Sequence, residues 1–249
     1  MKILGVIPAR YESTRFPGKV LATIGDKSMI QRVYLQATQA QLLDKVVVAT
    51  ESGKVLEHVE SFGGNCCLTG DHHVSGTDRC YEALTLQNET YDYVVNIQGD
   101  EPFLAPAQID EVAVLLDGSV ELATLVKQIS NQEELFSHGE VKTVFDNKMN
   151  ALYFSRQPIP FVRSLPENEW LEHQPYYKHI GIYAYRVDVL KQIANMPPSP
   201  LELAESLEQL RWLENDLAIK LALTHYESVC IDTPEDLERV LNNLSEYEP

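Results

Sequence analysis

The stretch GVIPARYESTRFPGK, residues 5–19, decides how the rest of this chain is interpreted. Its apolar start predicts a buried strand. The loop that follows carries Arg10, Arg15 and Lys19 within ten residues, together with Ser13 and a Pro-Gly turn, in a chain whose formal net charge is −17. A turn that exposes backbone N–H groups beside hydroxyls and cations is suited to a polyphosphate. The sequence therefore predicts an anion site at this loop.

The first half of the chain alternates short β-rich runs with amphipathic helical patterns. Strands are expected at 2–7, 45–50, 65–69 and 93–98, and helices at 29–41, 52–62, 78–87 and 106–117. Such alternation indicates βαβ units and a mainly parallel central sheet in an α/β fold. Sheets of this kind bind ligands at the carboxyl ends of their strands, which is where the cationic loop lies.

The second half contains more strand and less helix. Strands are expected at 122–129, 140–145, 151–156, 179–185, 219–226 and 228–231, and helices at 199–216 and 233–244. Between them, residues 157–170 are rich in proline and aromatic residues and are too irregular for a core, so they suggest a small lobe or an interface arm. The length of 249 residues fits one domain, 1–249, that includes such a lobe.

Composition excludes several classes of function. The negative net charge argues against nucleic-acid binding, because phosphate backbones require distributed Lys and Arg. No apolar run approaches the roughly 18 residues of a membrane span. Lys2 leads directly into the first strand, which does not fit a signal peptide, and the four cysteines form no C-x-x-C pair. We expect a cytoplasmic protein with reduced, buried cysteines.

Two carboxylates at strand ends are candidate metal ligands. Asp100 follows the strand at 93–98 behind Gly99, and Asp232 precedes a helix whose cap and first turn are explained by Thr233–Asp236. A carboxylate that faces the cationic loop could hold Mg²⁺ against a phosphate. For Asp100 the alternative is an ordinary Gly-Asp turn.

The segment HHVSGTDRC, residues 72–80, forms a polar turn before a helix. Ser75, Gly76 and Thr77 could recognise the edge of a base, or they could simply cap the helix. Arg79 is less usual, because a cation in the first turn opposes the helix dipole unless an anion is nearby.

Several motifs together resemble the 3-deoxy-manno-octulosonate (Kdo) cytidylyltransferases, also called CMP-Kdo synthetases. The resemblance runs nearly end to end and is carried by IPARYESTRFPGK, SGTDR, VNIQGDEP, ALYFSR, KHIGIYAYR, SPLELAESLEQLR and IDTPEDLERV. It implies a Rossmann-like, three-layer nucleotidyltransferase fold with a small mixed α/β lobe. It also implies that the chain forms a homodimer through an embedded segment at about 156–190, which also serves the sugar.

The resemblance also implies roles for particular residues. Arg15, Lys19 and Asp100 would carry catalysis, and Asp100 and Asp232 would hold Mg²⁺. Nucleotide binding falls on Arg10, Ser13, Arg15, Lys19, Ser75, Gly76, Thr77, Arg79 and Gln98, and sugar binding falls on Arg156, His179, Tyr183, Glu208 and Gln209. For His179 a structural histidine remains an alternative, and for Tyr183 a packed strand aromatic.

The resemblance implies that the anomeric hydroxyl of Kdo attacks the α-phosphate of CTP and releases pyrophosphate, for lipopolysaccharide assembly. Arg156 offers a planar, two-point donor for the sugar carboxylate. Two alternatives remain open at this point: a cytidylyltransferase for another sugar acid, such as sialic acid or 8-amino-Kdo, and a non-catalytic nucleotide sensor.

Overall fold

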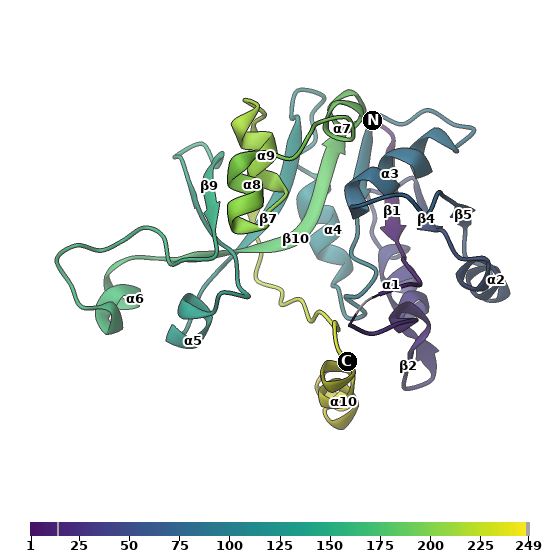
Figure 1. Cartoon of the computed structure of the whole chain (residues 1–249), viewed down its shortest axis with the longest axis horizontal. Coiled ribbons are helices and arrows are strands. Elements are labelled where there is room, and N and C mark those ends of the chain that lie inside the picture. The colour runs from purple at the N-terminus through teal and green to yellow at the C-terminus, as the bar shows by residue number, and fades with distance from the viewer. Residues whose placement is uncertain (14, 248–249) are drawn as a thin grey trace.

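A nine-stranded sheet runs through the described part of the chain, which in this computed structural model comprises residues 1–13 and 15–247 (Figure 1). Seven strands form its main path in the order β11-β7-β10-β6-β1-β4-β5. Their bounds are β1 Ile3–Pro8, β4 Lys45–Thr50, β5 Cys66–Leu68, β6 Tyr93–Asn96, β7 Leu122–Gln128, β10 Tyr177–Arg186 and β11 Ile219–Leu223. Strands β8 (Lys142–Phe145) and β9 (Ala151–Ser155) pair as a hairpin that branches from β10.

The sheet is mainly parallel, as predicted. β6, β1, β4 and β5 are parallel neighbours, and β11 is parallel to β7. Only β10 runs against this direction along the main path, because it pairs antiparallel with both β6 and β7. The parallel part places the carboxyl ends of β1 and β6 at the same edge, which positions the loops that follow them side by side.

Both faces of the sheet are buried, and helices cover each of them. Along β1, Ile3 and Ile7 belong to one apolar cluster and Leu4 and Val6 to another, as the alternation of a strand requires. The first cluster includes side chains of α1 (Met29–Ala37), α2 (Gly53–Ser61) and α4 (Pro106–Ala113). The second includes side chains of α3 (Gly76–Thr85), α7 (Val187–Ile193) and α9 (Gln209–Glu214). The three-layer architecture expected from the sequence is therefore present.

The helix expected at 199–216 is interrupted, so the prediction of one continuous helix was wrong. α8 spans Pro200–Glu205, and α9 begins at Gln209. Ser206 between them has φ 53°, in the left-handed region that ends many helices. Because of this break, the side chain of Leu207 points into the core and is buried, whereas that of Leu203 is 69% exposed.

The strand expected at 228–231 was also wrong. β11 ends at Leu223, and the chain then runs as a loop to α10 (Pro234–Asn242). Ile231 is nevertheless fully buried, because it packs with Ile24, Met29 and Val240 instead of joining the sheet. An apolar run therefore indicated burial correctly but not a strand.

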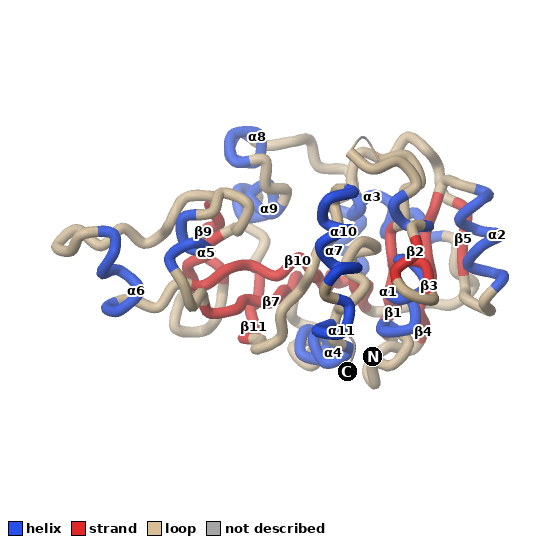
Figure 2. The backbone as a smooth tube through the Cα atoms, turned by 90° about the horizontal axis from the view of Figure 1, so that it is seen from below, coloured by secondary structure: helices blue, strands red, loops and turns tan. Residues whose placement is uncertain are grey.

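A lobe projects from the sheet beside β8 and β9, on the left in Figure 1, and Figure 2 shows the same projection from below. It contains α5 (Gln132–Phe136), a short 3₁₀ turn (Glu167–Glu169) and α6 (Trp170–His173). Its own small core is formed by Ile129, Leu135, Trp170 and Tyr176. The segment at 156–190 thus includes part of this lobe, with α6, and β10 of the central sheet, whereas α5 of the lobe lies outside it.

The remaining elements are short. They are the 3₁₀ turn Lys19–Leu21, the hairpin of β2 (Thr23–Ile24) and β3 (Lys27–Ser28), and the last helix α11 (Leu244–Tyr247). None of the helices in the described part of the chain combines the length and the apolar character that crossing a membrane requires.

Candidate active site

The loops after β1 and β6 are in close contact. Gly99 follows β6, and a Cβ atom at this position would lie 2.7 Å from the carbonyl oxygen of Pro8 at the end of β1. Any larger residue would force the two loops apart. The glycine therefore lets Asp100 lie against the cationic loop.

Lys19 joins the two predicted metal ligands. Its Nζ lies 2.6 Å from Asp100 Oδ2 and 2.8 Å from Asp232 Oδ1, and Arg15 Nη2 lies 3.0 Å from Asp232 Oδ2. Burial opposes the charge of Lys19, but the two carboxylates outweigh it and raise the pKa of the Lys19 ammonium. The predicted meeting of the N-terminal loop with Asp100 and Asp232 is confirmed.

Asp232 is held in place by local hydrogen bonds. The backbone N–H of Ile231 donates to the carbonyl of Asp100 at 3.0 Å, which fixes the loop before α10 against the loop after β6. The N–H of Asp232 donates to Asp236, which with Thr233 forms a capping box at the start of α10. The predicted helix cap is present, and it leaves the Asp232 carboxylate directed at Lys19.

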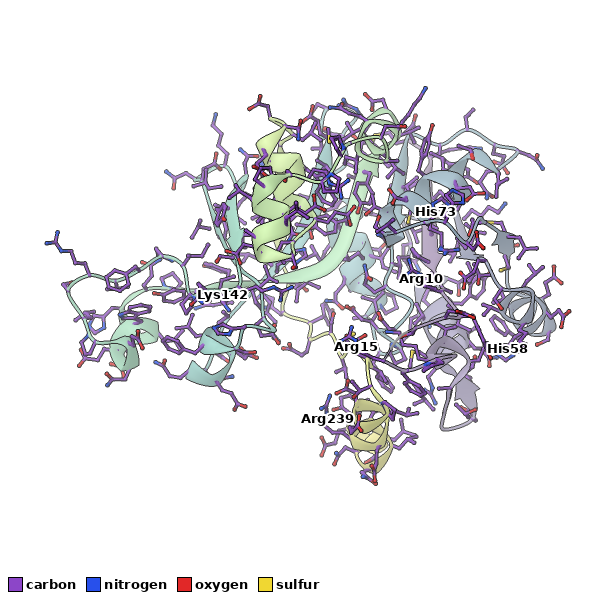
Figure 3. All side chains as sticks on the ribbon, viewed as in Figure 1. Arg10, Arg15, His58, His73, Lys142 and Arg239 are labelled. Carbon is purple, nitrogen blue, oxygen red and sulfur yellow. The ribbon has the colours of Figure 1, made fainter. Side chains whose placement is uncertain are left out.

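A cavity of about 290 Å³ opens between these loops. Eight of the nine predicted nucleotide-binding residues line it, together with Asp100 and Asp232; the eight are Arg10, Ser13, Arg15, Lys19, Ser75, Gly76, Arg79 and Gln98. In Figure 3, Arg10 and Arg15 lie in this central region, whereas Lys142 lies toward the lobe. The ninth residue, Thr77, lines the neighbouring cavity instead.

The anion expected beside Arg79 is a carboxylate of the protein itself. Arg79 is 1% exposed, and its Nη2 lies 3.0 Å from Glu51 Oε2, while Nη1 donates to Thr69 at 2.5 Å. Burial lowers the pKa of Arg79, although Glu51 opposes this shift. Glu51, which follows β4, was not found from the sequence, because its pairing joins the end of β4 to the first turn of α3, which no local pattern relates.

A second cavity adjoins the first and shares Gly76 and Gln98 with it. Three of the five predicted sugar-binding residues line it: Tyr183, Glu208 and Gln209. Asn96, Tyr185 and Trp212 also line it and were missed. Asn96 could have been identified as a candidate site residue from the sequence, since it is a polar residue at the end of an otherwise apolar strand, and it is buried in the structure.

The polar groups of the second cavity are unusual in having few partners. Asn96 Oδ1, Tyr183 Oη, Glu208 Oε1 and Trp212 Nε1 are buried and have no hydrogen-bond partner among the described residues. Burial raises the pKa of Glu208, although the hydroxyl of Thr77, which donates to Oε2 at 3.2 Å, partly opposes this. Orphaned polar atoms around a cavity indicate a polar ligand.

Two predicted sugar-binding residues lie outside this lining. His179 packs behind Tyr183, with ring centroids 5.0 Å apart, and burial lowers the pKa of its imidazole to about 3. Arg156 lies at the end of β9, where its guanidinium donates to the carbonyls of His138, Glu205 and Ser206. It lines neither cavity in the described part of the chain, so its contact with a sugar carboxylate stays a prediction.

Comparison with known proteins agrees with this geometry. The sequence model of a family described as cytidylyltransferase matches residues 4–221. A 3-deoxy-manno-octulosonate cytidylyltransferase of Parabacteroides distasonis is 51% identical, over 98% of this chain and 99% of the relative. One of the same name from Phocaeicola vulgatus is also 51% identical, over 100% and 99%.

Solved structures extend the comparison. A CMP:2-keto-3-deoxy-manno-octonic acid synthetase complexed with CTP is 39% identical and superposes over the full length of both chains, with a TM-score of 0.92. A cytidylyltransferase of Leptospira borgpetersenii shares the fold at 18% identity, with a TM-score of 0.65. From these full-length matches, the chain belongs to the 3-deoxy-manno-octulosonate cytidylyltransferase family.

Proposed function

We propose that this protein transfers CMP from CTP to the anomeric hydroxyl of Kdo and releases pyrophosphate. The observation that carries the proposal is the pair of adjoining cavities, one lined by cations and carboxylates and the other by neutral polar groups without partners. The family match and the CTP complex of the relative at 39% identity support the same reaction.

The cationic loop would bind the triphosphate. Arg10, Arg15 and Lys19 all line the first cavity, and at about 4 Å and an effective dielectric near 20 each unit charge pair contributes roughly 4 kcal/mol. Arg15 and Lys19 are paired with protein carboxylates, so a phosphate exchanges one anionic partner for another. The same cations stabilise the charge that develops on the departing pyrophosphate.

The carboxylates of Asp100 and Asp232 suit Mg²⁺. Together with Cys230 they place one ligand atom each within 4.8 Å of one another, and carboxylate oxygens are the hard ligands that Mg²⁺ prefers. Bound there, Mg²⁺ would neutralise phosphate charge and ease deprotonation of a nearby hydroxyl. Lys19 would then be released from both carboxylates and become available to phosphate oxygens.

The second cavity would hold the sugar. Kdo carries several hydroxyls, and the orphaned atoms of Asn96, Tyr183, Glu208 and Trp212 offer both acceptors and donors for them. Gly76 and Gln98 line both cavities, so the two ligands would lie side by side and their positioning would account for much of the catalysis.

We also propose a cytoplasmic homodimer that serves lipopolysaccharide synthesis. The lobe presents Phe161 at 71% exposure and β9 presents Leu152 at 61%, which are apolar surfaces that a partner subunit would cover. Sedimentation velocity of the wild type and of Phe161→Asp tests this association. A wild type that sediments as a monomer at all concentrations contradicts the dimer.

The decisive experiment measures pyrophosphate release with each of the four nucleoside triphosphates against Kdo, 8-amino-Kdo and sialic acid. CTP with Kdo and Mg²⁺ should give the highest kcat/KM. A higher value with another acid would reassign the sugar. Binding of CTP by calorimetry without pyrophosphate release from any acid would identify a sensor instead of an enzyme.

A further inference from the structure

A second cluster of metal-ligating side chains lies outside both cavities. His72 and His73 lie in the loop after β5, and Glu82 lies on the outer part of α3. One ligand atom of each of the three residues lies within 4.8 Å of the others. Figure 3 labels His73, which lies above Arg10 and away from Arg15.

The backbone of the loop gives the two imidazoles their positions. The ring of His72 folds back over Gly70 and fills the space that a Cβ atom would need there. The His72 and His73 rings are tilted neighbours, with centroids 4.4 Å apart. Glycine at position 70 is therefore what admits the His72 ring beside its neighbour.

The carboxylate is oriented as well. Glu82 Oε2 contacts His73 Nε2 and also accepts a hydrogen bond from the backbone N–H of Gly70 at 2.9 Å. A backbone donor that fixes a ligating carboxylate is a common outer-shell feature of metal centres. The side chain of His73 is 9% exposed and that of Glu82 is 30% exposed, so the cluster is partly shielded but reachable from solvent.

We propose that His72, His73 and Glu82 form a binding site for a divalent transition-metal ion of the zinc class. Two imidazoles and one carboxylate are ligands that Zn²⁺ favours, and a fourth position would remain for water. Mg²⁺ does not compete well for imidazole nitrogen, so this site differs in chemistry from the Asp100 and Asp232 pair.

An ion at this site would fasten the loop to α3. The loop supplies the carbonyls of His73 and Val74, to which Arg10 donates at 2.8 and 3.2 Å, and Thr69 at its start accepts from the buried Arg79. Two arginines of the nucleotide cavity therefore depend on the position of this loop. Because the ion binds the folded loop, it should also raise the melting temperature.

The test uses the full-length protein, freed of metal by a chelator and then supplied with excess Mg²⁺. All variants carry Cys230→Ser, because Cys230 lies beside Asp100 and Asp232 and would add a thiolate ligand for Zn²⁺. Co²⁺ is titrated with its visible absorption as the signal, and Zn²⁺ is then used to displace it. His72→Ala and Glu82→Gln are compared with His225→Ala, an exposed histidine elsewhere.

We expect one ion per chain at micromolar concentration in the parent and in His225→Ala, and binding at least about tenfold weaker in His72→Ala and Glu82→Gln. Zn²⁺ should raise the melting temperature of the parent but not of His72→Ala. His72 is exposed, so this variant should fold normally, which circular dichroism checks. Equal binding in all the variants, or no ion bound by the parent, would overturn the proposal.

Discussion

The two adjoining cavities hold their polar groups in opposite ways. In the first cavity, cations of the N-terminal loop are paired with carboxylates from distant loops, as Lys19 is with Asp100 and Asp232. In the second cavity, polar atoms such as Glu208 Oε1 and Tyr183 Oη are buried and lack partners among the described residues. One site is assembled by attraction between charges and the other by packing of the core.

This difference predicts how substitutions in each cavity should change ligand binding and stability. Removal of a charge from the first cavity changes what it binds, while the cores on either side of the sheet stay intact. Removal of a group from the second cavity also changes packing and desolvation, because Tyr183, Tyr185 and Trp212 in its lining belong to the core. Effects on turnover and on stability should therefore separate in the first cavity and combine in the second.

Asp100→Asn should have the largest effect on turnover, and it tests whether activity and stability separate in the first cavity. It removes the charge that faces Lys19 and the proposed metal, so kcat/KM should fall by about a hundredfold or more. The melting temperature should change little, because Lys19 keeps its ion pair with Asp232 at 2.8 Å. Steady-state rates at saturating CTP and Mg²⁺, with thermal unfolding in parallel, give both quantities.

The matched control is Asp26→Asn, an exposed carboxylate on the β2–β3 hairpin that pairs with Lys27. It should retain the wild-type rate. A near-normal rate in Asp100→Asn would show that Asp100 is not a ligand of the proposed Mg²⁺.

Arg156→Ala should have the next largest effect on the kinetic constants. It tests whether residues on the lobe side of the sheet contribute to sugar binding. Arg156 donates to the last carbonyls of α8, and α8 leads directly to Glu208 and Gln209. The KM for the sugar should rise about tenfold and that for CTP much less, because a lost charged hydrogen bond costs roughly 1.5–3 kcal/mol. Substrate titrations measure both constants. An equal rise in both would show that the carboxylate partner of the sugar lies elsewhere.

The first cavity could be predicted from the sequence because its residues occupy places that topology fixes. Arg10, Lys19 and Asp100 follow strands of a parallel sheet, and parallel strands deliver their following loops to one edge. The local signals were sufficient: a Gly-Asp turn, a cluster of cations and a helix cap.

The second cavity could be predicted only in part, because packing forms it. The rings of Trp212 and Tyr185 pack together there, with centroids 5.6 Å apart, and the chain between α8 and α9 breaks at Ser206, whose carbonyl accepts from Arg156 at the end of β9. No local pattern contains that contact. The same limit explains residues 228–231, whose apolar character serves a small cluster with Ile24 instead of a strand.

Glu208→Gln should change stability in a way that depends on pH. Burial raises the pKa of Glu208 above its unfolded value, so the folded protein holds a proton that the unfolded chain releases. Wild-type stability from this group is therefore greatest below pH 4.5 and declines as the pH rises through the folded pKa. The melting temperature of Glu208→Gln relative to wild type should increase from pH 5 to pH 8. A difference that is constant across this range would show that the carboxyl is ionised in the folded state.

His179→Gln should have the smallest effect on turnover, because His179 lies outside the lining of the second cavity, and its effect on stability should be specific to acid pH. Thr124 Oγ1 donates to the carbonyl of Ile182 at 2.6 Å, so it accepts from His179 Nε2 at 3.0 Å, and a glutamine amide could replace that donor.

The pH dependence of stability tests the state of this imidazole. Burial lowers the pKa of His179 from 6.5 to about 3, so below pH 6.5 the unfolded chain binds a proton that the folded protein does not bind. This contribution is complete above pH 6.5 and is lost as the pH falls below that value. Between pH 7.5 and pH 5 the wild type should lose about 2 kcal/mol more than the variant in urea unfolding. Parallel losses would mean that the imidazole behind Tyr183 takes up a proton in the folded protein as readily as in the unfolded chain.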